Sequence, residues 1–276
     1  EVNGDSALSA ASLDALLRNT AGSQVRLRVR AQRAGAEAGI RDVIVQPLSA
    51  RDAFDLRYDE WEYTRRKMVD SLSHGRIGYV HLRAMGAADI AQWERDFYPV
   101  FDRDALIVDV RGNNGGNIDS WILEKLMRRA WMFWQPRIGA PYWNMQQAFR
   151  GPMTVLVNEH TASDGEAFAY GFRSLGLGKV IGTRTWGGEI WLSSSNVLVD
   201  RGIATAAENG VYGPQSEWLI EGHGVDPDIV VDDTPHETFE GRDAQLEAAV
   251  KALTAELAQH PPSVPRPPKY PDKKTP

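Results

Sequence analysis

The stretch from Ala105 to Asn117 reads Ala-Leu-Ile-Val-Asp-Val-Arg-Gly-Asn-Asn-Gly-Gly-Asn and decides the fold class. Its first six residues are mostly apolar, which predicts a strand buried on both faces, as in parallel sheets covered by helices. A glycine-rich turn follows, and then a helical pattern from Ile118 to Trp131. Strand, turn and helix in this order favour a layered α/β domain.

The same alternation continues on both sides of that stretch. Apolar runs predict strands at 77–82, 154–157 and 180–182, and helical spacing predicts helices at 88–98, 165–175 and 243–259. Nearer the N-terminus, we expect strands at 24–30 and 42–48 with a turn between Gly35 and Gly39. Ser12 can cap a short helix, and residues 51–72 form a charged amphipathic helix.

These elements divide the 276 residues into four parts. Residues 1–50 are a small β-rich piece, about half the size of a stable domain. Residues 51–74 are a helical connector, and residues 75–258 are the α/β domain. The tail at 259–276 is rich in proline and lysine, and we expect it to be flexible.

Composition excludes several classes of protein. The chain has 31 basic and 37 acidic residues, a net charge of −6, and 42% hydrophobic residues. It is therefore not wholly disordered, and it lacks the basic balance typical of nucleic-acid binders. No apolar run reaches the length of a membrane span, and no signal peptide is visible. The absence of cysteine excludes a thiol nucleophile and fits a cytoplasmic location.

Three segments are candidates for chemistry, and the first is Asn158 to Glu166. Ser163 lies there between a predicted buried strand and a predicted helix. A serine at such a turn presents its hydroxyl beside the free N–H groups of the helix N-terminus, which favour a developing oxyanion. Ser followed by Asp and Glu is equally an ordinary helix cap. The pattern alone therefore leaves nucleophile and cap both open.

The other two segments are also ambiguous. The glycines of Arg111 to Asn117 allow close approach of a ligand and an anion-binding nest, or they make a tight strand-to-helix turn. No phosphate-binding glycine motif is present there. Ile220 to Asp228 places Glu221 and His223 among glycines, which suits the orientation of a base or a solvated turn. Their spacing matches no zinc signature.

Taken together, these segments resemble the tricorn-type branch of the carboxy-terminal-processing peptidases. The resemblance covers about residues 75–256, through Gly75–His81, Ile107–Arg111 with its glycines, Asn158–Gly165, Leu175–Gly188 and Glu221–Asp228. It implies a crotonase-like (ClpP-like) catalytic core preceded by a PDZ domain. Residues 1–50 look like the C-terminal half of such a PDZ domain. We therefore expect the chain to be N-terminally truncated, as its start at Glu1 rather than Met also suggests.

The resemblance also implies roles for individual residues. Ser163 matches the nucleophile, and Glu221 matches the acidic member of the proton-relay network. The backbone N–H of Asp164 and that of Gly115 or Gly116 match the oxyanion hole. The family mechanism is acyl transfer through an acyl-enzyme, and it needs no metal or organic cofactor.

Two departures from the family pattern concern the base and the substrate pocket. Gly188 stands where the other branch has a lysine base, so a Ser–Lys dyad is not expected. In the tricorn branch the base is a histidine upstream of the PDZ domain, which lies outside this sequence. His160 and His223 are possible substitutes or substrate contacts. Trp134 stands near the position of an acid that favours basic substrates, so an apolar or aromatic pocket, or simple packing, is implied instead.

The sequence thus predicts a serine peptidase that acts on peptides or unfolded proteins. Because the expected base lies outside this sequence, we expect that this stretch alone is inactive. The resemblance further suggests a homo-oligomer, a trimer or hexamer, with neither nucleic acid nor membrane as partner. The first alternative is an inactive peptide- or ligand-binding module on the same fold, because fold does not imply function. The last is a crotonase-type acyl-CoA enzyme, which the serine and glutamate segments fit poorly.

Overall fold

The computed structural model describes residues 1–30, 39–190, 197–203 and 207–269. The chain forms two compact units, Glu1–Thr64 and Arg65–Pro276, and each is described by itself. The turn expected between Gly35 and Gly39 begins outside the described residues. No helix in the described ranges is both long and apolar enough to cross a membrane.

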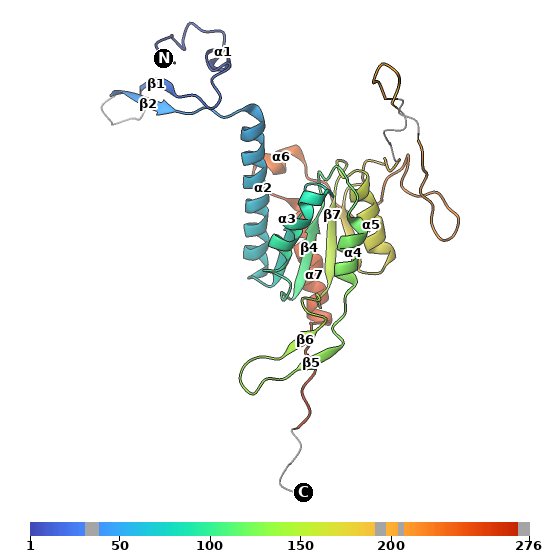
Figure 1. Cartoon of the computed structure of the whole chain (residues 1–276). Coiled ribbons are helices and arrows are strands. Elements are labelled where there is room, and N and C mark those ends of the chain that lie inside the picture. Colours follow the sequence, from blue (N-terminus) through green and yellow to red (C-terminus); the bar gives the residue numbers. More distant parts are fainter. Residues whose placement is uncertain (31–38, 191–196, 204–206, 270–276) are drawn as a thin grey trace. The chain divides into compact units, whose positions relative to one another are not determined.

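The first unit contains a short helix and an antiparallel pair of strands (Figure 1). Helix α1 (Leu13–Leu16) begins as predicted, because the Ser12 side chain accepts a hydrogen bond from the Ala15 N–H. Strand β1 (Val25–Arg30) pairs with β2 (Ile40–Val45). Strand β2 begins and ends earlier than the predicted range 42–48. The next helix, α2 (Ala50–Ser73), starts in this unit and ends in the second.

A parallel sheet of five strands forms the centre of the second unit. The spatial order is β3-β4-β7-β8-β9, and every neighbouring pair is parallel. The strands are β3 (Ile77–His81), β4 (Ala105–Asp109), β7 (Met153–Val157), β8 (Gly178–Gly182) and β9 (Ile229–Val230). Because parallel strands end at one edge, the turns after β4 and β7 meet there. The predicted mixed α/β class is thus confirmed.

Helices cover both faces of this sheet (Figure 1). One hydrophobic core joins the sheet to α3 (Ala87–Phe97), α4 (Asp119–Met127) and α5 (Asp164–Ser174). The other joins it to the end of α2 and to α7 (Ala244–Gln259). Strand β4 is apolar from Ala105 to Val108 because both of its faces are buried. Leu106 and Val108 enter the first core, and Ala105 and Ile107 enter the second. Successive side chains point to opposite faces of a strand.

Three features of the second unit differ from the sequence prediction. The helix predicted for 118–131 ends at Met127, and the chain then forms a hairpin of β5 (Met132–Trp134) and β6 (Tyr142–Asn144). Strand β9 and helix α6 (Pro235–Phe239) were not predicted, because both are too short to show a period.

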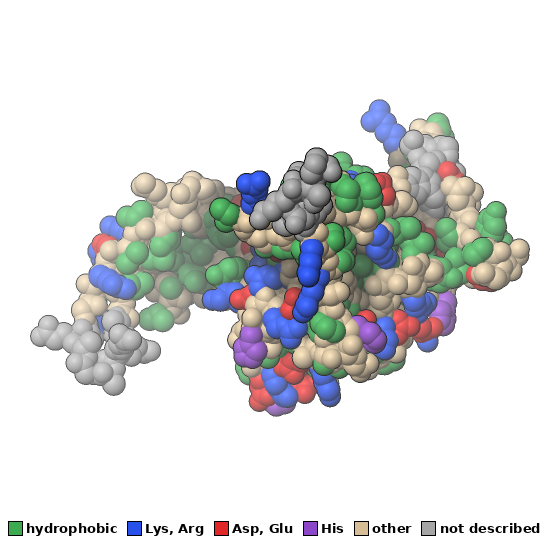
Figure 2. Space-filling view, turned by 90° about the horizontal axis from the view of Figure 1, so that it is seen from below, with side chains coloured by type: hydrophobic (Ala, Val, Ile, Leu, Met, Phe, Trp, Pro, Cys, Tyr) green, Lys and Arg blue, Asp and Glu red, His purple; other side chains and the backbone are tan. Residues whose placement is uncertain are grey.

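On the described part of the face in Figure 2, basic and acidic side chains intermingle without a continuous basic patch.

Candidate active site

Ser163 lies at the turn between β7 and α5, and its backbone is in an unusual conformation. It is the N-cap of α5, with φ of 53° and ψ of −130°. A residue other than glycine with positive φ costs on the order of 1–3 kcal/mol, which surrounding contacts must offset. Two contacts hold the Ser163 N–H, from the Gly188 carbonyl oxygen and from Oε2 of Glu166, each at 3.1 Å. The turn therefore fixes the direction of the serine side chain.

The glycine turn after β4 packs directly against this serine. A Cβ atom added to Gly115 would lie 2.5 Å from the Cβ and 2.9 Å from the Oγ of Ser163. The same position is 3.1 Å from the backbone nitrogen of Asp164. At Gly116 an added Cβ would lie 1.9 Å from the Met85 carbonyl oxygen. Both positions require glycine, and the Oγ of Ser163 faces a backbone that carries no side chain.

Asn113 connects the two turns and decides which N–H groups are available. It is fully buried, and its Oδ1 accepts a hydrogen bond from the Gly115 N–H at 2.9 Å. Its backbone oxygen accepts one from the Ala162 N–H at 2.8 Å. The Gly115 N–H is thus already used inside the loop. Of the two glycines that match the oxyanion hole, Gly116 is the better candidate donor, and Gly115 contributes by its missing side chain.

Glu166 anchors a third loop beside the serine. Its buried carboxylate accepts hydrogen bonds from the N–H groups of Gly187 at 2.7 Å and Gly188 at 2.9 Å. It also accepts one from the Thr185 hydroxyl and one from the Ser163 N–H. One carboxylate therefore joins the turn at Ser163 to the loop at 185–188. The sequence pattern indicated Glu166 only as part of a helix cap.

Glu221 reaches the same region through the next residues of that loop. Its Oε2 accepts hydrogen bonds from the N–H groups of Glu189 at 2.7 Å and Ile190 at 2.9 Å. Because Gly188 contacts Ser163, the structure brings Glu221 to the side of the sheet that carries the serine. The link between the two side chains runs through the loop, and Glu221 is at the surface.

Two carboxyl groups near the serine have raised pKa values. Burial raises the pKa of Asp164 to about 6, and the negative charge of Asp119 adds to the shift. Burial also raises the pKa of Glu189 to about 8, with further contributions from Asp164 and Glu166. The Glu189 carboxyl is therefore mostly protonated at neutral pH. Perturbed groups of this kind concentrate at functional sites, although ion networks perturb pKa values as well.

The two histidines considered as bases are not brought to the serine. His160 is exposed and lies 3.4 Å from the Glu159 carboxylate. His223 is also exposed, and its Nε2 lies 2.7 Å from Oδ2 of Asp226. Among the described residues, no histidine or lysine nitrogen contacts the Ser163 hydroxyl. Within the same ranges, no group of three His, Asp or Glu side chains is arranged to hold a metal ion.

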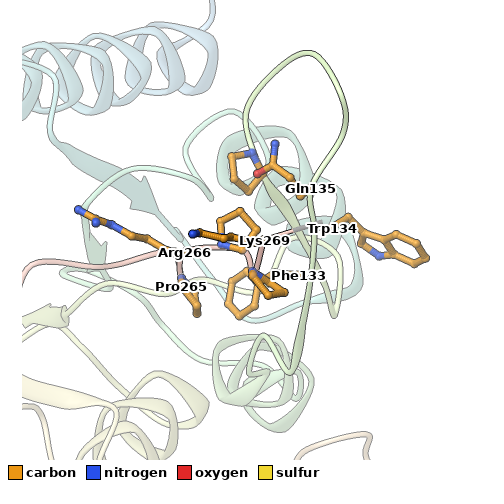
Figure 3. A pocket seen from close by; sticks show the side chains of 9 residues that line it. Phe133, Trp134, Gln135, Pro265, Arg266 and Lys269 are labelled. Atoms are coloured by element: carbon orange, nitrogen blue, oxygen red, sulfur yellow. The ribbon is translucent and has the colours of Figure 1, made fainter. Parts of the chain in front are cut away.

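Trp134 lies on the hairpin that follows α4 and not beside Ser163. It lies on β5, which follows α4, and α4 leads from the glycine turn across about 14 Å to the opposite edge of the sheet. Its indole stacks on Tyr142, and its Nε1 donates to Oδ1 of Asn144 at 3.0 Å. Beside this hairpin, a pocket of about 330 Å³ is formed with the tail at 265–269 (Figure 3). The stacking and hydrogen-bond contacts of Trp134 thus lie within the hairpin, and the substrate contact implied by the resemblance stays a prediction.

A buried ion network lies at the end of β4, where the glycine turn begins. Arg111 donates to both carboxylate oxygens of Asp109, at 3.0 and 2.7 Å, and to both of Asp243, at 2.9 and 3.1 Å. The Tyr79 hydroxyl donates to Asp109 at 2.8 Å. Burial of Asp109 opposes its charge, but Arg111 lowers its pKa below the usual value. The network ties α7 to the strand that ends at the site.

Sequence reasoning missed Asn113, Glu166 and Glu189 as site residues. Asn113 and Glu166 contact backbone groups of turns distant in sequence, and the pKa of Glu189 is raised by burial and by charges from other turns, so no local spacing identifies any of them. The one available signal was position. All three lie within three residues of a glycine already singled out or of Ser163.

Comparison with known proteins agrees with this geometry. The family model for peptidase family S41 matches residues 76–231. The chain belongs to peptidase family S41. The match spans all five strands of the parallel sheet, from β3 to β9, and it includes both turns that meet at Ser163. The family and the tricorn-type resemblance predicted from the sequence are thereby confirmed.

Individual relatives of family S41 are similar over most of this chain. Tricorn protease of Thermoplasma acidophilum is 34% identical over 93% of the chain and 23% of the relative. Tricorn protease homolog 1 of Streptomyces coelicolor is 39% identical over 91% of the chain and 23% of the relative. A crystal structure of the tricorn protease superposes with a TM-score of 0.78 at 33% identity, over 94% of this chain and 25% of that one. The chain thus spans about a quarter of these relatives.

Proposed function

We propose that this chain carries the nucleophile and oxyanion hole of a serine peptidase that cleaves peptides or unfolded proteins through an acyl-enzyme. The observation that carries the proposal is the meeting of two turns. Ser163, held at positive φ at a helix N-terminus, faces Gly115, where any side chain would collide with its Oγ. A strained serine at a strand-to-helix turn is the arrangement of a nucleophile elbow. Membership of family S41 and the tricorn relatives support the same activity.

The proposed reaction has two halves. In the first, the Ser163 Oγ attacks the peptide carbonyl carbon while a base takes its proton. The carbonyl oxygen becomes an oxyanion that accepts hydrogen bonds from the N–H groups of Asp164 and Gly116. The intermediate then expels the amine, which receives the proton. In the second half, water hydrolyses the serine ester by the same route. Each oxyanion donor contributes about 3 kcal/mol to the transition state.

The general base in this proposal is a histidine upstream of residue 1, as the tricorn resemblance implies. The support is that neither His160 nor His223 contacts Ser163, since each pairs with a carboxylate at the surface. Glu221 would complete the proton relay from its place beside the loop at 189–190. A serine without a base is a poor nucleophile, so this stretch by itself would react slowly.

The first unit would be the C-terminal half of a PDZ domain. Its antiparallel pair β1–β2 and the short helix α1 support this assignment. The crotonase-like assignment of the second unit rests on its parallel sheet with helices on both faces. A homo-oligomer stays a prediction from the resemblance, and a cytoplasmic location stays a prediction from the composition.

The second candidate function is a binding module that has lost catalysis. The absence of a nitrogen base at Ser163 among the described residues favours it. Membership of a peptidase family weighs against the third reading, an acyl-CoA enzyme. The two remaining candidates differ in whether Ser163 reacts.

Labelling with a fluorophosphonate, followed by intact-mass measurement, tests the proposal. This chain and a version extended upstream are each compared with their Ser163→Ala variants. We expect labelling of the extended wild type only. Labelling of both wild-type chains would place the base inside this sequence and direct mutagenesis to His160 and His223. Labelling of neither would favour the binding module.

A further inference from the structure

We infer that the side chain of Asp164 is a positioning residue that locks together the two halves of the oxyanion hole. This inference rests on the proposed function and deepens it. The proposed mechanism uses only the backbone N–H of Asp164. The carboxylate has a separate set of contacts, which reach across to the element that follows the glycine turn.

The contacts of the carboxylate form a bridge between two helices. Asp164 is 6% exposed and is the first residue of α5. Its Oδ2 accepts hydrogen bonds from the backbone N–H of Ile118 at 2.7 Å and of Asp119 at 3.1 Å. These two N–H groups belong to the start of α4 and would otherwise lack an acceptor within their own helix. One oxygen therefore connects the starts of α4 and α5.

The bridge lies where the two proposed oxyanion donors must keep their spacing. One donor, the Asp164 N–H, belongs to the residue whose side chain forms the bridge. The other, the Gly116 N–H, is two residues before Ile118, which the bridge holds. Ile118 also caps α4 without a side-chain hydrogen bond of its own. If the bridge is lost, the glycine turn and the serine turn can move apart, and a shift of 1 Å in such a site can cost about 100-fold in rate.

The charges around the bridge make it sensitive to acid. Asp119 lies beside Asp164 at the start of α4, and Glu189 faces it from the loop at 183–190. Glu166 follows on the same helix. Burial and the Asp119 charge raise the pKa of Asp164 to about 6, although the two N–H donors oppose the shift. Below that pH the protonated carboxyl is a weaker acceptor, so the bridge loosens as pH falls through 6.

The first test measures the rate of fluorophosphonate labelling of Ser163 in the chain extended upstream. Asp164→Ala removes the bridge, and we expect the rate to fall by about 30- to 100-fold. Asp164→Asn keeps an acceptor oxygen in nearly the same shape, so the loss should be less than about fivefold. Asp228→Ala is the matched control, because Asp228 also accepts a backbone N–H, that of Val180, outside this site. Its rate should stay within twofold of the wild type.

The second test uses pH to separate positioning from simple stability. The rate for wild type should fall below about pH 6 more steeply than the rate for Asp164→Asn. A histidine base would lower the labelling rates of both proteins alike as the pH falls. The difference between their two pH profiles therefore reports the protonation of Asp164. Asp119→Asn removes the neighbouring negative charge and should lower the pKa of Asp164, so the fall in rate caused by Asp164 should begin at a lower pH. A purely structural role would change unfolding without changing the pH profile.

A third measurement does not depend on catalysis. The amide protons of Ile118 and Asp119, followed by NMR, should exchange faster with solvent below about pH 6 in wild type than in Asp164→Asn. Folded Asp164→Ala that labels within twofold of wild type would overturn the inference and leave the proposed function intact. Equal pH profiles for wild type and Asp164→Asn would also overturn it. No labelling of any variant would remove the proposed function, and the positioning role would fall with it.

Discussion

Replacing Gly115 with alanine tests whether the two turns form a reactive site. The added Cβ would lie 2.5 Å from the Cβ and 2.9 Å from the Oγ of Ser163. Ordinary contacts of a Cβ are about 1 Å longer, so one of the two turns must move by roughly that amount. A displacement of this size at a nucleophile costs about 100-fold in rate. We therefore expect fluorophosphonate labelling of Ser163 to fall about 100-fold in the chain extended upstream.

The same substitution also affects stability, and a second glycine separates the two effects. Gly115 has φ of +91°, where a Cβ costs about 1–2 kcal/mol. Overpacking against the serine adds about 1–3 kcal/mol. Gly176→Ala is the matched control, because Gly176 has φ of +69° and an added Cβ there would meet nothing within 4 Å. It should lose only about 1 kcal/mol of unfolding free energy in urea and label at the wild-type rate.

The labelling rates of the two glycine variants show whether Gly115 shapes the site or only stabilises the fold. If folded Gly115→Ala labels within threefold of the wild type, the glycine turn does not shape the space at the serine hydroxyl, and the proposed oxyanion hole is wrong. If Gly176→Ala slows labelling as much as Gly115→Ala, the effect comes from loss of stability rather than from the site.

Three further predictions concern charged groups around the sheet. Arg111→Met should lower the unfolding free energy by about 3–5 kcal/mol in urea, because it leaves the Asp109 carboxylate buried without its cation and leaves Asp243 with Arg65 alone; a loss below 1 kcal/mol would contradict the ion network. His81 has its pKa lowered to about 4 by burial, which outweighs the nearby Asp109, so the unfolded chain binds the proton first as pH falls below 6.5. Wild type should therefore lose about 2 kcal/mol more than His81→Gln between pH 7 and pH 5, and parallel stability curves would refute this. Glu189 changes the stability in the opposite direction. Its pKa is raised to about 8, so as the pH rises the unfolded chain releases this proton before the folded chain does. Glu189→Gln should therefore stabilise the protein by about 1–2 kcal/mol at pH 8, a value reduced for partial exposure, and by nothing at pH 4; equal gains at both pH values would show that the charge is irrelevant.

Much of the fold could be predicted because burial leaves a local signature. Strand β4 is covered on both faces, so its first four residues are apolar without a period, and α5 begins directly after its capping residue Ser163. The hairpin β5–β6 could not be predicted in this way. Its strands of three residues are stabilised by each other, as in the pairing of Phe133 with Trp143, and short elements carry no periodic signal of their own.

The candidate site was predictable in part for a related reason. Ser163 and the glycines follow buried strands, and parallel strands deliver their ends to one edge of a sheet. The roles of Asn113 and Glu166 depend on acceptor oxygens that meet backbone N–H groups from distant turns. Trp134 was placed at the site by its position in a family pattern, but α4 carries the chain to the other edge before that residue is reached.

The sequence by itself determined the alternation of buried strands and amphipathic helices, the serine at a helix start and the glycine turn that follows a buried strand. These depend on patterns within about ten neighbouring residues, where hydrophobic period and backbone freedom act directly. Only the tertiary structure decided that the Gly115 N–H is already used, that Glu166 holds the loop at 185–188, and that Asp164 bridges two helix starts. Those contacts join residues 2 to 46 positions apart, and a hydrogen bond requires an angle and a distance that only the folded chain provides.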